Sequence, residues 1–329
     1  MSDYNRLPPI GGIDLGATKI LSVVVSETGS LLSEDVRPTM SDEGHEAVIG
    51  HMAASLRKAL AKAGIAEDKL GGIGVCAPGP IDHAHGIVTR PPNLPGWHDV
   101  PLASRIAEAF GVPCVLENDA NCAAIAEHRW GAGRGSQHML FLTLSSGVGG
   151  GIIVNGALYR GASGLAGEVG HITVNTHGPS CGCGRRGCLE AYASGLAITR
   201  QGLRLVAKHP DSPLARLVKE DPPLSAILIH EAADKGDEGA RELVREAGYN
   251  LGIGLASLVN IFNPQVVVLG GGLTKMGDLY LGPMREAIQN ECFPQAWRDL
   301  RIAVGELGDK APALGAAAIA LETHLQARE

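Results

Sequence analysis

The chain of 329 residues lacks any uninterrupted apolar run that approaches the length of a membrane span. Its N-terminal stretch, MSDYNRLPPIGG, contains no apolar core of signal-peptide length. Aromatic residues make up only 4% of the chain while 45% of it is apolar, as in a globular protein with a substantial core. The sequence therefore predicts a protein with no membrane partner.

The chain also has no excess of positively charged residues. The formal net charge is −7, which disfavours non-specific binding to nucleic acid and predicts no nucleic-acid partner. Cys76, Cys114, Cys122 and Cys292 are scattered through apolar segments, which is typical of buried thiols in a reducing compartment. We therefore expect a cytoplasmic protein.

Three other cysteines are concentrated in one glycine-rich segment. Cys181, Cys183 and Cys188 form a C-x-C-x4-C run, and His171 lies ten residues upstream. Three thiolates and one imidazole are the ligand set of a closed, tetrahedral zinc site, which has a structural role because no position is left for water. A disulfide is disfavoured because Cys181 and Cys183 are too close in sequence to pair easily. His177 is also near enough to be the fourth ligand, and spacing alone leaves that choice open.

A P-loop is absent, because no G-x4-G-K-[ST] run occurs. Glycine turns between strands are present instead, and their backbone N–H groups can hold phosphate oxygens. The first turn follows a strand that ends at Asp14, whose carboxylate can hold magnesium through water. Its residues are Gly16, Ala17, Thr18 and Lys19. Residues 139–160 repeat the pattern with Ser146 and Gly147 in the turn, so two such units facing each other would hold one triphosphate.

Polar residues also follow two other apolar strands. Asn118 and Asp119 lie where a strand meets a helix, and open α/β folds bind ligands at such junctions. From the residues alone, Asp119 is explained equally well as the helix N-cap. Pro-Gly-Pro around Gly79 forces a turn at the end of a further strand. Asn93, beside two prolines, is explained best by itself as a turn former.

The motifs around the cysteines carry a family resemblance. The run E-x-G-H ends at His171 and is followed by C-x-C-G-x-x-G-C-x-E, which ends at Glu190. Together they resemble the ROK family of bacterial sugar kinases and related repressors, over nearly the whole chain, and within it the ATP-dependent glucokinases most. The resemblance implies a two-domain α/β fold of the actin-like ATPase and sugar kinase (ribonuclease H-like) type with an interdomain cleft. We expect residues 1–118 plus about 310–329 to form a small domain, and residues 119–309 a large domain that carries the zinc motif.

The resemblance also implies roles for the residues named above. The cleft would hold MgATP and a hexose, with Asp119 as the catalytic base and Asn118 positioning the sugar. The other sugar-binding residues would be Gly79, Asn93, Glu168, His171 and Glu190. The two glycine turns correspond to phosphate loops, with Ala17 where a glycine is usual and Ser146 where a threonine is usual. Gly271 and Gly272 correspond to the adenosine-side loop, although alone they indicate only a tight turn.

The implied activity is phosphoryl transfer from ATP to the 6-hydroxyl of glucose. Kinases for N-acetylmannosamine, N-acetylglucosamine, mannose or fructose share most of these motifs and stay as alternatives. A sugar-responsive repressor is less expected, because only about ten residues precede the first phosphate turn, too few for a DNA-binding domain. Dimers are common in the family, so we expect a homodimer.

Overall fold

The first sheet of the structure comes from the N-terminal third of the chain. The computed structural model describes residues 7–326. Five strands lie in the order β3-β2-β1-β4-β7. Their bounds are β1 (Ile10–Leu15), β2 (Lys19–Val25), β3 (Leu31–Pro38), β4 (Gly72–Ala77) and β7 (Cys114–Asn118). β2 pairs antiparallel with both β1 and β3, whereas β4 pairs parallel with β1 and β7. The carboxyl ends of β1, β4 and β7 therefore meet at one edge of the sheet.

The second sheet repeats this topology. Its strands lie in the order β10-β9-β8-β11-β12, again with an antiparallel hairpin followed by parallel strands. Their bounds are β8 (Met139–Leu144), β9 (Val148–Val154), β10 (Ala157–Leu158), β11 (Val266–Gly270) and β12 (Arg301–Val304). The duplication predicted from the two glycine-turn units is thus confirmed, and it extends to the strands that pair with each unit. A small hairpin, β5 (Ile81–Asp82) and β6 (Ile87–Val88), follows β4.

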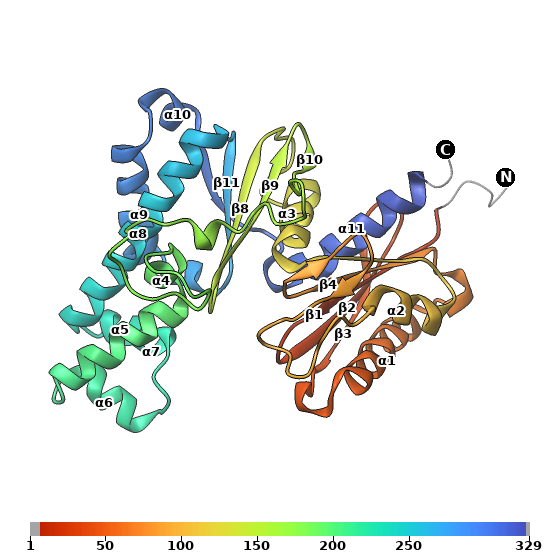
Figure 1. Cartoon of the computed structure of the whole chain (residues 1–329), viewed down its shortest axis with the longest axis horizontal. Helices are drawn as coiled ribbons and strands as arrows, with labels where there is room; N and C mark the ends of the chain where they lie inside the picture. Colours follow the sequence, from red (N-terminus) through yellow and green to blue (C-terminus); the bar gives the residue numbers. More distant parts are fainter. Residues whose placement is uncertain (1–6, 327–329) are drawn as a thin grey trace.

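Helices cover both sheets (Figure 1). α1 (His45–Ala63) and α2 (Leu102–Phe110) pack on one face of the first sheet, where aliphatic residues at helical spacing such as Met52 and Leu56 are fully buried. The second sheet is flanked by a larger helical group with its own core. Its members are α4 (Glu190–Ala193), α5 (Gly195–Lys208), α6 (Pro213–Glu220), α7 (Ala226–Asp234), α8 (Glu238–Phe262), α9 (Asp278–Glu291) and α10 (Pro294–Asp299).

Two helices lie between the sheets. α3 (Asp119–Trp130) and the C-terminal helix α11 (Ala311–Gln326) pack against each other, and α11 also packs on β1 and β4 (Figure 1). Their small residues share one buried core with apolar residues from both sheets. We propose on these contacts that α11 returns to the first domain, which keeps the expected division at residues 118/119 and about 310.

Short 3₁₀ turns join several of these elements. They are η2 (Ser41–Glu43), η3 (Glu67–Lys69), η4 (Val169–His171), η5 (Gly272–Met276) and η6 (Gly308–Lys310). Within residues 7–326, no helix combines the length and the apolar character needed to cross a bilayer.

Candidate active site

The predicted catalytic residues lie at the carboxyl ends of neighbouring parallel strands. Asp14 pairs in register with Cys76 of β4, and the Cys76 thiol donates a hydrogen bond to Asp14 Oδ1 at 3.3 Å. In the next strand pair, Ala77 is in register with Asn118. Gly79 lies against the same asparagine, since a Cβ on it would be 3.4 Å from Asn118 Nδ2. Three strands therefore bring Asp14, Gly79 and the Asn118–Asp119 pair to one edge.

Asn118 is the N-cap residue of α3, a role that the sequence also allowed for Asp119. Asn118 Oδ1 accepts hydrogen bonds from the N–H groups of Ala120 and Asn121 at 2.9 and 3.3 Å. Asp119 is the first residue of α3, and its Oδ1 accepts from Ala120 N–H at 2.8 Å. Because Asn118 already caps the helix, the cap requirement does not explain a carboxylate at position 119.

Burial controls the charge of the two carboxyl groups. It raises the pKa of Asp119 to about 6, against the opposing Ala120 N–H, and the nearby Glu168 carboxylate adds to the rise. Burial and the charge of Asp119 raise the pKa of Asp14 to about 7, while the Cys76 hydrogen bond and Lys19 act in the opposite direction. Each group thus senses another acidic side chain, which is typical of a site built to receive a cation or a proton.

An ion pair between a buried glutamate and a half-buried arginine, which the sequence did not predict, supports this segment. Glu117 precedes Asn118, is only 3% exposed and accepts a hydrogen bond from Arg160 Nε at 2.7 Å. Its other oxygen accepts from Asn118 N–H and Asn121 Nδ2 at 2.9 and 3.0 Å. Glu117 therefore ties the Asn118–Asp119 junction to the start of the segment that leads to Glu168. An acidic residue ending an otherwise apolar strand was the available sequence signal.

The predicted first phosphate loop is a tight turn between β1 and β2. Gly16 N–H donates to Lys19 O at 3.0 Å, and Thr39 Oγ1 donates to Gly16 O at 2.7 Å. Thr18 and Lys19 are exposed, and Ala17 is half-buried. Lys19 Nζ lies 3.0 Å from Asp309 Oδ2 in η6, a contact that links positions 290 residues apart. That distance in sequence is why the pair could not be predicted from the motif.

The predicted second phosphate loop, between β8 and β9, lies beside the glycine turn after β11. Ser145 N–H donates to Gly147 O at 3.0 Å, and Ser146 is exposed. Gly271 has φ +88° and packs against the backbone of Leu144 at the end of β8, so a side chain there would collide. Ser146, Gly147 and the pair Gly271–Gly272 therefore lie on neighbouring strand ends, as their predicted roles require.

The cysteine segment folds into one cluster of metal-binding groups. The ligand atoms of His171, Cys181, Cys183 and Cys188 all lie within 4.8 Å of one another. Cys181 Sγ is 3.7 Å from His171 Nδ1, and Cys183 Sγ is 3.7 Å from Cys188 Sγ. A tetrahedron with Zn–S bonds of about 2.3 Å has edges of roughly 3.8 Å, so the donor set and its spacing fit zinc. The group contains His171, whereas His177 is exposed and lies outside it.

The two glutamates that flank the cluster point to different partners. His171 Nε2, the nitrogen that does not face the thiols, lies 3.9 Å from Glu168 Oε2. Glu190 Oε1 lies 3.7 Å from Cys181 Sγ, and Glu190 Oε2 accepts from Val148 N–H at 3.1 Å. Glu168 therefore borders the free edge of the histidine, while Glu190 reaches the second phosphate loop. The contact between Glu190 and Val148 was not predicted from the sequence.

Asn93 is separate from these groups. It is exposed on a loop anchored by Leu94 and Trp97, each 1% exposed. Among the described residues it makes no hydrogen bond to the other predicted site residues. Its place at the sugar therefore stays a prediction.

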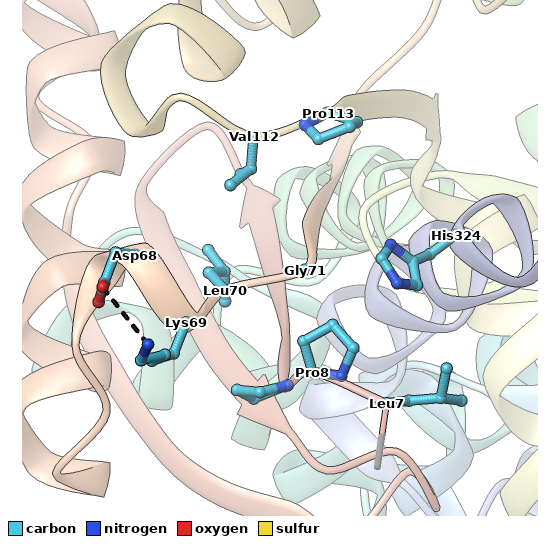
Figure 2. Close-up of a pocket in the computed structure, with 10 residues that line it drawn as sticks. Leu7, Pro8, Asp68, Lys69, Leu70, Gly71, Val112, Pro113 and His324 are labelled. Atoms are coloured by element: carbon cyan, nitrogen blue, oxygen red, sulfur yellow. Dashed lines mark ion pairs between the residues drawn. The ribbon is translucent and has the colours of Figure 1, made fainter. Parts of the chain in front are cut away.

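A cavity of about 680 Å³ lies away from this site. It is at the amino ends of the parallel strands, beside Pro8, Gly71 and Pro113 (Figure 2). His324 of α11 closes one side of it. Ligands of open α/β sheets bind at the carboxyl ends of the strands, so this cavity is on the wrong edge for the predicted chemistry.

The sequence model of the ROK family matches residues 10–323. The chain belongs to the ROK family. A glucokinase from Thermotoga maritima is 37% identical over 311 residues, which cover 94% of this chain and 96% of that protein. The structure is also similar to a ROK hexokinase from Thermus thermophilus, with a TM-score of 0.83, 38% identity and coverage of 97% of this chain and 99% of that one.

A further similar structure is a ROK glucokinase from Streptomyces griseus in complex with glucose and AMPPNP. Its TM-score is 0.81 at 35% identity, and the match covers 95% of this chain and 99% of that one. These likenesses confirm the predicted actin-like sugar kinase fold, which both sheets and their shared topology display.

Proposed function

We propose that this ROK family member is an ATP-dependent glucokinase that phosphorylates the 6-hydroxyl of glucose. The observation that carries the proposal is the likeness to proteins named glucokinase at 36–37% identity over more than nine tenths of both chains. The paired phosphate loops and the buried carboxylates at the strand ends provide the parts that such a reaction needs.

Asp119 is the proposed general base. Phosphoryl transfer depends on positioning and charge neutralisation, so the protein needs one group that orients the sugar hydroxyl and accepts its proton. A carboxyl with a pKa near 6 is ionised at neutral pH and still basic enough to accept that proton. Asn118, fixed as the helix cap, would bind an adjacent hydroxyl.

Residues from both sides of the site would bind the remaining sugar hydroxyls. Gly79 contributes backbone beside Asn118. Glu168 and the Nε2 edge of His171 lie together, and they would bind neighbouring hydroxyls as a pair. Asn93 and Glu190 complete the proposed set.

The two glycine turns would hold the triphosphate. In the first loop, the N–H groups of Ala17 and Thr18 and the Lys19 ammonium would face the phosphates, and Asp14 would hold magnesium through water. Ser146 and Gly147 do the same in the second loop, and Gly271–Gly272 border the adenosine. Magnesium, when bound with ATP, neutralises charge on the phosphate oxygens.

Zinc is the proposed occupant of the His171, Cys181, Cys183 and Cys188 cluster. With four protein ligands it would order the loop and supply no reacting water. We also propose that the protein is a cytoplasmic homodimer with no nucleic-acid partner. Sedimentation velocity tests the dimer directly, and a single monomer species would refute it.

A hexose panel tests the substrate assignment. Sugar-dependent ADP release is measured with glucose, mannose, fructose, N-acetylglucosamine and N-acetylmannosamine, and the position of the phosphate is read by ³¹P NMR. We expect the highest kcat/KM with glucose and the phosphate on O6. A higher kcat/KM with mannose or N-acetylmannosamine would overturn the assignment.

A further inference from the structure

We propose that Glu190 and the short helix α4 hold the second phosphate loop in position and couple its order to the zinc cluster. This inference rests on the proposed function only for the identity of the ligand, a nucleoside triphosphate. Its structural basis is a continuous set of contacts from a metal-binding cysteine to the loop.

One segment of seven residues holds the loop at three points. Glu190 Oε2 accepts from Val148 N–H at 3.1 Å. Gly195 N–H donates to Ser145 O at 2.8 Å, and Leu196 N–H donates to Ser146 O at 3.2 Å. Residues 190–196 therefore hold the loop through the carbonyl oxygens of Ser145 and Ser146 and through the amide of Val148.

The N-terminal end of this segment lies next to the metal cluster. Cys188 is a cluster residue, and α4 starts two positions later at Glu190. Ala191 N–H donates to Cys188 O at 2.9 Å, so the first turn of α4 is bonded to the cysteine itself. Glu190 Oε1 is also 3.7 Å from Cys181 Sγ, a second cluster atom.

The far end of α4 is fixed from the core. Tyr280 of α9 is fully buried, and its hydroxyl donates to Ala193 O at 2.7 Å. α4 is only four residues long and cannot be stable by itself. Its position thus depends on Cys188 at one end and on Tyr280 at the other.

The hydrogen bond from Val148 N–H to Glu190 also determines which amides of the loop remain free to bind phosphate. In the described part of the chain, the N–H groups of Ser146 and Gly147 donate to no protein acceptor. Glu190 occupies the next amide, and a Cβ on Gly147 would lie 2.7 Å from Glu190 Oε2. The Glu190 carboxylate therefore holds the loop at Val148 and leaves the two preceding amides, those of Ser146 and Gly147, free for an anion. If the cluster loses its metal, Cys188 and Cys181 are released, and the loop loses this support.

Hydrogen exchange tests the coupling without any substrate. The exchange of the Ser145 and Val148 amides, which donate to Gly147 O and Glu190 Oε2, is measured by mass spectrometry with single-residue fragmentation. Zinc-loaded protein is compared with protein treated with a high-affinity zinc chelator. We expect at least a tenfold loss of protection at these two amides, while the Gly16 amide of the first loop, which donates to Lys19 O, keeps its protection. Unchanged protection of Ser145 and Val148 after verified zinc removal would overturn the coupling.

Three variants then separate a role at the phosphate loop from a role at the sugar. Affinity for Mg²⁺–AMPPNP is measured by calorimetry in the absence of sugar. Glu190→Ala should bind about tenfold more weakly, because a charged hydrogen bond to the loop is lost, whereas Glu190→Gln keeps an acceptor and should stay within about threefold of wild type. Glu168→Gln is the matched control beside His171 and should bind the nucleotide as wild type does.

The outcomes are distinct from those of the glucokinase assay. Wild-type nucleotide affinity in Glu190→Ala, together with a raised KM for glucose, would confine Glu190 to the sugar and overturn the proposal. If Glu190→Ala does not fold, the exchange experiment on wild type still decides. Failure of wild type to phosphorylate glucose would refute the proposed function and leave both readouts valid.

Discussion

Two buried carboxylates determine how the candidate site responds to pH. Asp119 has a pKa raised to about 6 and Asp14 a pKa raised to about 7, in both cases chiefly by burial. The pKa of a carboxyl group is normally far below these two values. The buried carboxylates at the ends of β1 and β7 therefore carry an unfavourable electrostatic energy in the folded protein. Such a cost is expected where the charge is used in the reaction.

The pH dependence of activity follows from Asp119. If it is the base, kcat/KM for glucose should fall about tenfold per pH unit below roughly pH 6, because only the ionised group accepts a proton. Asp119→Asn should lower kcat by roughly 10²–10⁴-fold and remove this dependence. Initial rates between pH 5 and 8 check both. A wild-type profile that is flat down to pH 5 would contradict the assignment.

The raised pKa of Asp119 also predicts that Asp119→Asn makes the protein more stable although it lowers the activity. The folded-state pKa of Asp119 lies above its unfolded value of 3.8, so folding binds a proton between these values and the penalty of the buried charge is complete above about pH 6. Asp119→Asn should therefore raise the free energy of unfolding by roughly 1–3 kcal/mol at pH 7.5.

Urea unfolding at pH 7.5 and pH 4 measures this effect. The stabilisation should shrink at pH 4, where the wild-type group is largely protonated in the folded state. Asp211→Asn, on the exposed surface, is the control and should change nothing. A destabilised Asp119→Asn at pH 7.5 would show that the carboxylate is needed for the fold.

Among the elements, α11 lies in close backbone contact with β1, β4 and α3. A Cβ on Gly12 of β1 would collide with the backbone of Ala313, and one on Gly74 of β4 with that of Ala316. On the helix itself, a Cβ on Gly315 would collide with the backbone of Cys122 in α3. Two strands and α11 itself thus carry glycine where their backbones approach a neighbour, and no side-chain rearrangement can make room for a Cβ there.

Gly74→Ala should consequently displace α11 and destabilise the protein by more than about 2 kcal/mol, since backbone must move. Gly50→Ala is the matched control, because Gly50 lies in α1 with nothing within 4 Å of its Cβ position. That change should stabilise the protein by up to about 1 kcal/mol. Denaturant midpoints measure both, and equal effects of the two substitutions would disprove the close-packing argument.

Local sequence patterns predicted much of the molecule. Apolar strands followed by glycine turns predicted both strand–turn–strand units, and their repetition predicted the shared topology of the two sheets. The cysteine spacing predicted a cluster that the structure assembles, although only the fold selects His171 over His177. Motif spacing works here because each of these features is built within about thirty residues.

Long-range contacts could not be predicted in this way. The pairing of Lys19 with Asp309 joins residues at opposite ends of the chain. Glu117 meets Arg160 across the two halves, and Glu190 reaches Val148 only because α4 folds back on the loop after β8. Each pair depends on which surfaces the packed sheets and helices bring together, and no periodicity in the sequence encodes that.

For the whole molecule, the central claim is that the two sheets hold glucose and MgATP so that Asp119 can act on the sugar. The most direct test compares glucose-dependent ADP release by wild type and Asp119→Asn, with glucose binding measured separately for each. The account predicts turnover by wild type, loss of it in the variant, and glucose affinity within about threefold in both, because Asn keeps the hydrogen-bonding shape of the side chain. Equal turnover by the two proteins, or none by wild type that binds both glucose and nucleotide, would contradict it.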